Sequence, residues 1–158
     1  ALHEKGIYHR DIKPSNIIIC ENKPVLIDFS ISTFDNATAL TQIGSVIGTP
    51  QYLSPEAHLQ NSSFDTSASS DWWGFSATLC FALTGKPPFG EAAATLSNIN
   101  AGNIDLQGLG ASVRQILSVA LDPDIKNRAS AWETLDELAN NVKKHRFRDR
   151  MFIWLNKN

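Results

Sequence analysis

A charged loop near the amino end of the chain holds three side chains of complementary chemistry. Within six residues, between two apolar runs, lie a carboxylate, an ammonium and a carboxamide: Asp11, Lys13 and Asn16. Asp11 can accept a proton, Lys13 can balance negative charge, and Asn16 can give an oxygen to a hard cation. Phosphoryl transfer uses these properties, because it needs an oriented hydroxyl, cations on the phosphates and a metal that neutralises developing charge.

Taken singly, each of these residues has an ordinary structural interpretation. Isolated Asp and Lys residues in loops are usually solvated, and an isolated His is usually structural. The ordered string H-R-D-I-K-P-S-N, from His9 to Asn16, is far more specific. It resembles the catalytic loop of protein kinases, and the lysine two residues after the aspartate resembles the serine/threonine branch of that family.

The next stretch predicts a small β-hairpin that returns the chain to this loop. Ile17–Cys20 and Val25–Ile27 are short apolar runs, and Glu21–Pro24 is predicted as the turn between them. On local grounds Asp28 is a turn former at a strand end. The resemblance implies more: L-I-D-F-S is similar to the metal-binding D-F-G segment of kinases, so that Asp28 and Asn16 would hold Mg²⁺ on the phosphates of ATP.

Residues 31–47 are mostly polar and loosely patterned, which predicts a loop. By resemblance they belong to the activation segment, which runs from residue 28 to residue 56. Thr41 is the favoured phosphorylation candidate, ahead of Thr38 and Ser45. A phosphate there could pair with Arg10 and order the loop through charge-assisted hydrogen bonds.

Residues 48–56, G-T-P-Q-Y-L-S-P-E, form the second motif. Locally they predict a helix start, with a serine cap, a proline at the first position and a glutamate at the positive end. The same string resembles the substrate-positioning loop and A-P-E segment of serine/threonine kinases, particularly bacterial ones. The resemblance implies that Thr49 hydrogen-bonds near Asp11 and Lys13.

Two further acidic residues are implied to support the site. The resemblance pairs Glu56 with a distant arginine, for which Arg128 is the candidate. The apolar stretch Asp71–Thr84 predicts a core helix and resembles the central helix of the kinase large lobe. In that lobe the first aspartate accepts backbone hydrogen bonds from the catalytic loop, in which His9 and Arg10 give structural support.

The predicted central helix is apolar nearly all round. Trp72 and Trp73 are therefore expected to be core residues rather than ligand-binding ones. The string D-W-W-G-F-S departs from the family pattern, in which a small polar residue precedes and a glycine follows. This exchange of Gly74 and Ser76 is expected to change packing only.

Together these patterns predict an α+β, predominantly helical chain: the large C-terminal lobe of a protein kinase with one small β-hairpin. Ala1–Gly6 is predicted to be the end of a helix, and further helices are expected within Gly90–Asn103, after a cap at Ser112 and after a capping box at Ser130. The lobe is assigned to residues 1–140 and a tail to residues 141–158. No G-x-G-x-x-G loop, V-A-I-K-type lysine or paired glutamate is found, so the small N-terminal lobe is expected to be absent.

Composition excludes some classes of partner. A net charge of -2 over 158 residues provides no field that would attract nucleic acid. Cys20 and Cys80 lie in apolar runs, which predicts buried thiols in a reducing, cytoplasmic compartment. No signal peptide or membrane span is evident. The basic and apolar stretch 143–155 is either a solvated helix end or a juxtamembrane segment on the cytoplasmic side of a membrane.

Three functions are weighed against these observations. The first is a serine/threonine protein kinase in which Asp11 orients the hydroxyl of a protein substrate and accepts its proton, Lys13 steadies the phosphoryl group, and Asn16 and Asp28 hold Mg²⁺. The second is a pseudokinase scaffold, mildly favoured by Ser30, which replaces a conformationally free glycine. The third is an unrelated helical interaction domain, which the ordered motifs disfavour. The 158 residues alone are expected to be inactive and to expose an apolar surface that meets the small lobe.

Overall fold

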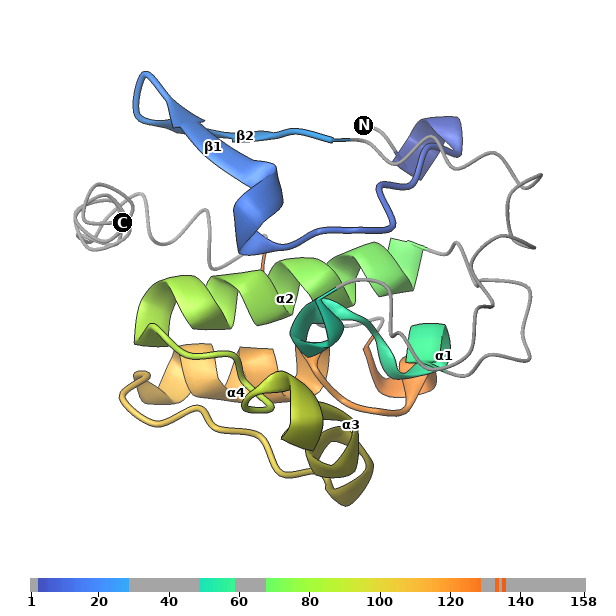
Figure 1. Cartoon of the computed structure of the whole chain (residues 1–158), viewed down its shortest axis with the longest axis vertical. Coiled ribbons are helices and arrows are strands. Elements are labelled where there is room, and N and C mark those ends of the chain that lie inside the picture. The colour runs from blue at the N-terminus through green and yellow to red at the C-terminus, as the bar shows by residue number, and fades with distance from the viewer. Residues whose placement is uncertain (1–2, 29–48, 59–67, 129–132, 134, 136–158) are drawn as a thin grey trace.

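The computed structural model describes residues 3–28, 49–58, 68–128, 133 and 135, and the structural statements below concern these residues. Its central element is helix α2, Ala68–Thr84. The loop of residues 9–16 and the hairpin lie on one side of α2, and helices α3, Ala92–Ala101, and α4, Ala111–Ala120, lie on the other (Figure 1). The predicted class, mainly helical with one small hairpin, is confirmed.

The hairpin is tighter than the sequence predicted. Strands β1, Ile17–Cys20, and β2, Lys23–Leu26, pair antiparallel, so the turn contains only Glu21 and Asn22. Both turn residues have positive φ, 48° and 63°, as in a two-residue type I′ turn whose twist matches that of the strands. The predicted four-residue turn is wrong, because Pro24 is tolerated in a two-stranded sheet where every strand is an edge.

Three helix boundaries also differ from expectation. Helix α2 begins at Ala68, before the predicted Asp71. Helix α4 begins at Ala111 after Gly110, so Ser112 lies inside its first turn instead of capping it. The predicted helix end at the amino terminus is a single 3-10 turn, His3–Lys5, followed by Gly6 with a φ of 70°. Helix boundaries are the least determined feature of a hydrophobic pattern, since termini depend on individual hydrogen bonds.

The core gathers around α2. Trp73 is fully buried and stacks on Phe89, with ring centroids 5.3 Å apart and planes 4° from parallel. The expectation that Trp73 belongs to the core is therefore confirmed. A second cluster joins α2 to α4 through Cys80 and Leu117, both fully buried. Cys20, in contrast, is exposed on the hairpin, so the prediction that both thiols are buried is wrong for this one.

The carboxyl-terminal part is described only at Glu133 and Leu135, both helical, with Leu135 packed against α4. The predicted cap at Ser130 and the tail of residues 141–158 lie outside the described residues. Within the described part of the chain, no helix has the length and apolar content needed to cross a membrane.

Candidate active site

A single buried carboxylate holds the catalytic loop, residues 9–16, against the start of α2. Asp71 is 3% exposed, and its Oδ2 accepts a hydrogen bond from the backbone N of His9 at 2.8 Å. Its Oδ1 accepts one from the backbone N of Arg10 at 2.7 Å. His3 also reaches this carboxylate, with Nε2 2.8 Å from Oδ2. Because the first two contacts use main-chain donors, they hold the path of the loop whatever its side chains are.

The backbone of the loop takes an unusual conformation at Arg10, whose φ is 69°. A non-glycine residue in the left-handed region is disfavoured and persists where surrounding contacts hold it. Here the contact is the bond from its own N–H to Asp71. This residue in the left-handed region comes directly before Asp11 in the chain.

His9, which is 2% exposed, connects the loop to the end of the hairpin. Its Nε2 lies 2.9 Å from the carbonyl oxygen of Ile27, and its Nδ1 lies 3.4 Å from the backbone N of Asp11. One neutral tautomer satisfies both contacts, since Nε2–H donates to the carbonyl and Nδ1 accepts from the amide. His9 thus links the backbone of Asp11 to Ile27, the residue that precedes Asp28.

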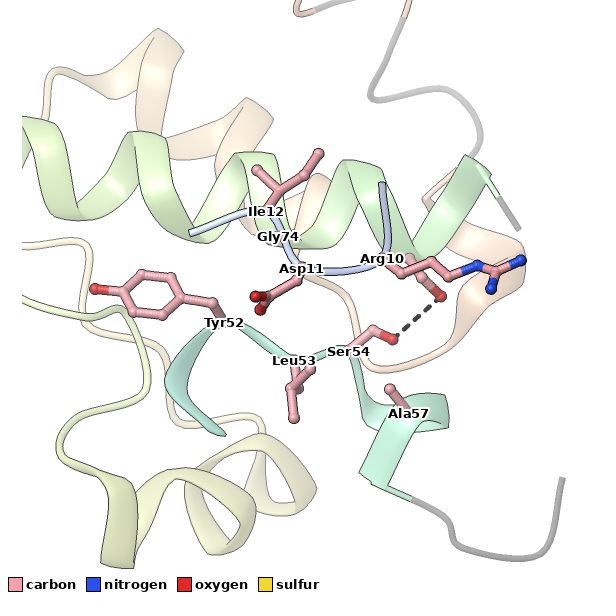
Figure 2. A pocket seen from close by; sticks show the side chains of 9 residues that line it. Arg10, Asp11, Ile12, Tyr52, Leu53, Ser54, Ala57 and Gly74 are labelled. Atoms are coloured by element: carbon pink, nitrogen blue, oxygen red, sulfur yellow. Dashed lines mark hydrogen bonds between the residues drawn. The ribbon is translucent and has the colours of Figure 1, made fainter. Parts of the chain in front are cut away.

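Lys13 and Asn16 both contact the carboxylate of Asp11. Lys13 Nζ lies 2.7 Å from Asp11 Oδ2, and Asn16 Nδ2 donates to the same oxygen at 3.0 Å and to the Asp11 carbonyl at 2.7 Å. None of the described residues donates a hydrogen bond to Asp11 Oδ1. This oxygen can therefore accept a hydrogen bond from another donor. Figure 2 shows the carboxylate pointing from the loop toward Tyr52 and Leu53.

Asn16 and Asp28 carry the oxygens that could hold a cation. Asn16 is 6% exposed and its Nδ2 is committed to Asp11, which orients the amide so that Oδ1 is left to accept. The backbone N of Ile27 donates to the Asn16 carbonyl at 2.8 Å. Asp28 is the next residue after this contact; it is exposed and has a φ of 55°. One carboxylate and one amide fit Mg²⁺, which binds few protein oxygens and keeps waters or phosphates as its other ligands.

A small pocket opens beside Asp11, between the catalytic loop and the substrate-side loop, residues 49–58 (Figure 2). The pocket is lined by Arg10, Asp11, Ile12, Tyr52, Leu53, Ser54, Ala57, Ser70 and Gly74. Burial, with added effects of the negative charges of Glu91 and Cys80, raises the pKa of Tyr52 to about 12. Tyr52 therefore lines this pocket as a neutral phenol.

Thr49 precedes the 3-10 turn Pro50–Tyr52 at the entrance of the substrate-side loop. Among the described residues its hydroxyl forms no hydrogen bond with Asp11 or Lys13, so its role remains a prediction. Thr41 and Ser30 lie outside the described residues, as do the other phosphorylation candidates.

The substrate-side loop is held by an ion pair that spans 72 residues of sequence. Arg128 donates through Nη1 to Glu56 Oε1 at 2.8 Å and through Nη2 to Oε2 at 2.9 Å. Arg128 is 4% exposed, and its guanidinium lies 4.6 Å from the centroid of the Trp73 ring. Burial by itself raises the pKa of Glu56, but the hydrogen bonds and the charge of Arg128, with a backbone hydrogen bond, lower it overall.

Three residues around the site were not found by sequence reasoning in these roles. His3 contacts Asp71, and Ser70 Oγ donates to Glu56 Oε1 at 3.0 Å. At Gly74 an added Cβ would lie 2.8 Å from the carbonyl oxygen of Ile12, so the glycine lets the catalytic loop approach α2. The exchange of Gly74 and Ser76 does concern packing, as expected, but at Gly74 it is packing against the catalytic loop. The only signal for Gly74 was a glycine inside a helix, where it is otherwise unfavourable.

The chain matches the family described as protein kinase domain over residues 1–148. It is 33% identical over 141 residues to the serine/threonine-protein kinase AfsK of Streptomyces coelicolor, covering 88% of this chain and 17% of that protein. It is 34% identical over 154 residues to the serine/threonine-protein kinase PknB of Mycobacterium tuberculosis, covering 90% and 24%. The probable serine/threonine-protein kinase PkwA of Thermomonospora curvata is 31% identical over 141 residues, covering 88% and 19%.

The chain thus spans less than a quarter of the length of each of these relatives. This chain belongs to the protein kinase family, and specifically to its bacterial serine/threonine type.

Proposed function

We propose that this chain supplies the catalytic and substrate-side half of an ATP- and Mg²⁺-dependent protein serine/threonine kinase. The observation that carries the proposal is the geometry of Asp11. One carboxylate oxygen is held by Lys13 and Asn16, and the other is left to accept a proton at the mouth of the pocket. A general base must lie within hydrogen-bond reach of the hydroxyl that it activates, and this arrangement leaves room for one.

The other residues have separate tasks. Asp11 orients the hydroxyl of a protein serine or threonine and accepts its proton at Oδ1. Lys13, held 2.7 Å from Asp11, places a positive charge where the transferring phosphoryl group would lie. Asn16 and Asp28 would hold Mg²⁺, which, when bound with ATP, neutralises charge on the phosphates. Phosphoryl transfer depends mainly on such positioning and electrostatics, so exact placement of these groups matters more than their reactivity.

The remaining part of the nucleotide site would come from polypeptide outside these 158 residues. The hairpin supports this, because its cross-strand pair Ile18 and Val25 is 42% and 40% exposed. Such an apolar pair suits contact with a small lobe or with the nucleotide base. We therefore expect negligible phosphotransfer from the 158 residues alone, and measurable transfer by the purified chain would contradict this expectation.

The experiment is transfer of the γ-phosphate of ATP to a basic test protein, with Mg²⁺, by the protein expressed from its full reading frame. Asp11→Asn and Asp28→Asn are expected to lower transfer by about 100-fold or more, because each removes a carboxylate with an assigned task. Asp105→Asn is the matched control. Asp105 is exposed, and its side-chain Oδ1 accepts a hydrogen bond from the backbone N of Gln107.

Loss of transfer in both variants, with activity kept in the control, would support the kinase. No transfer by the unaltered protein, together with weak or absent binding of ATP, would favour a pseudokinase scaffold. That alternative is motivated by Ser30, which stands where the family pattern has glycine.

A further inference from the structure

Two consecutive residues at the start of α2 contact the two opposite walls of the pocket. Asp71 holds the catalytic loop by the backbone amides of His9 and Arg10. Ser70 contacts the substrate-side loop, residues 49–58: its Oγ accepts a hydrogen bond from Ser54 Oγ at 3.3 Å and donates to Glu56 Oε1 at 3.0 Å. Ser70 therefore lies between the two walls, and it lines the pocket itself.

The contacts of Ser70 belong to a continuous polar chain. Ser54 donates to Ser70, Ser70 donates to Glu56, and Glu56 is held by the two terminal nitrogens of Arg128. Ser54 is 2% exposed and Arg128 is 4% exposed, so the two ends of this hydrogen-bonded series are shielded from water, and Ser70 and Glu56 between them are partly exposed. Hydrogen bonds in such surroundings are strong, and each group that loses its partner is left with an unfavourable desolvation.

The geometry also explains what the chain of hydrogen bonds would control. Ser54 directly follows Tyr52 and Leu53, the two residues toward which the Asp11 carboxylate points (Figure 2). Its hydroxyl joins this part of the loop to α2 by a hydrogen bond, beside the packing of the Tyr52 ring on Phe81 of α2, with ring centroids 6.2 Å apart. A shift of Ser54 would move the adjoining Leu53 relative to Asp11, while Tyr52 stays packed on α2 and the catalytic loop stays anchored by Asp71.

We propose that Ser70 is a positioning residue for the protein substrate, acting through Ser54 and Glu56 and touching no reacting atom. This inference rests on the proposed kinase function. It separates two tasks within α2: Asp71 sets the catalytic loop, and Ser70 sets the distance of the substrate-side wall from it. Loss of the Ser70 hydroxyl should therefore impair use of the protein substrate more than use of ATP.

The test compares Ser70→Ala, Ser70→Thr and Ser118→Ala in the protein expressed from its full reading frame, with myelin basic protein as the probe substrate. Ser118→Ala is the matched control, because its hydroxyl is exposed and donates only within α4, to the Gln115 carbonyl. We expect Ser70→Ala to raise the KM for the probe protein by about three- to tenfold, the size of one lost hydrogen bond. The KM for ATP should rise at least threefold less, and Ser70→Thr should restore the probe KM to within about twofold.

Equal rises in both KM values, or no rise in either, would overturn the proposal. A Ser70→Ala variant that fails to fold would overturn it as well, because the hydroxyl would then serve stability instead of positioning.

If the unaltered protein transfers no phosphate, the proposed function fails, and hydrogen–deuterium exchange still tests the contact itself. Ser70→Ala should then speed exchange at residues 52–58 by at least threefold while residues 9–16 keep their rate. Equal acceleration of both segments, or of neither, would show that Ser70 does not hold the substrate-side loop selectively.

Discussion

The catalytic loop and the substrate-side loop form the two walls of one pocket, but they are held in different ways. The catalytic loop is fastened through its main chain, by two backbone amides that donate to Asp71. The substrate-side loop is fastened through side chains, by Ser54, Ser70 and the Glu56–Arg128 pair. A main-chain anchor tolerates changes of residue type in the loop it holds, whereas a side-chain anchor needs every one of its partners.

Both anchors converge on the first turns of α2. Asp71 lies in the first turn of this helix, where the helix dipole favours a carboxylate. The middle of the same helix is buried in the core through Trp73, Ala77 and Cys80, all 0% exposed. The two walls are therefore joined to a helix whose middle is buried in the core.

The largest effect is expected from the main-chain anchor. Asp71→Asn replaces one accepting oxygen of the carboxylate by an NH₂ group, which is itself a donor. This group must face one of the donors from His9, Arg10 or His3. We expect a loss of about 4 kcal/mol in the free energy of unfolding, from weakened charge-assisted bonds and one donor left without an acceptor. Urea unfolding of the protein expressed from its full reading frame measures it, with Asp105→Asn as the exposed control. A change below about 1 kcal/mol would mean that Asp71 is not the anchor.

The side-chain anchor should give a slightly smaller effect that depends on which partner remains. Arg128→Met leaves Glu56 without its guanidinium, and we expect a loss of about 3 kcal/mol in the free energy of unfolding. Glu56→Met/Arg128→Met removes both charges together. Its loss should be smaller than the sum of the two single losses by about 1–3 kcal/mol. Additive losses in this double-mutant cycle would contradict a coupled pair.

The contact between the catalytic loop and α2 can be tested without touching either anchor. Gly74→Ala places a Cβ 2.8 Å from the Ile12 carbonyl oxygen, an atom of the backbone that cannot rotate away. We expect a loss of about 1–3 kcal/mol in the free energy of unfolding, with lowered phosphotransfer because the loop must move. Gly110→Ala, whose Cβ would meet nothing within 4 Å and whose φ is -62°, is the matched control. Similar losses in both variants would show that close approach is not the reason for the glycine.

The smallest effect concerns pH. The folded state holds the pKa of Glu56 below its ordinary value of 4.5. Ionised Glu56 therefore contributes stability that is fully present above about pH 4.5 and is lost as the pH falls toward the folded-state pKa. Thermal unfolding across this acid range should show a shallower decline in Glu56→Gln than in the unaltered protein. Parallel declines would indicate that other carboxylates dominate acid unfolding.

The sequence was most informative where function depends on a local string. The order of His9–Asn16 was enough to predict which residues meet at Asp11, because five residues of chain cannot separate them far. The string at residues 48–56 likewise predicted a helix start, and α1 begins at Pro55. Local turn chemistry was less well predicted, since Glu21 is not a usual residue at the first central position of a type I′ turn.

By itself, the sequence determined the family, the helical class, the buried central helix and the identity of the charged residues around Asp11. The tertiary structure alone decided how those residues are held: His3 on Asp71, Ser70 between Ser54 and Glu56, and Gly74 against Ile12. The physical reason is that the groups needed for the reaction lie close together in the sequence, within one local motif. Contacts between segments 14 to 68 residues apart depend instead on how α2 packs against both loops.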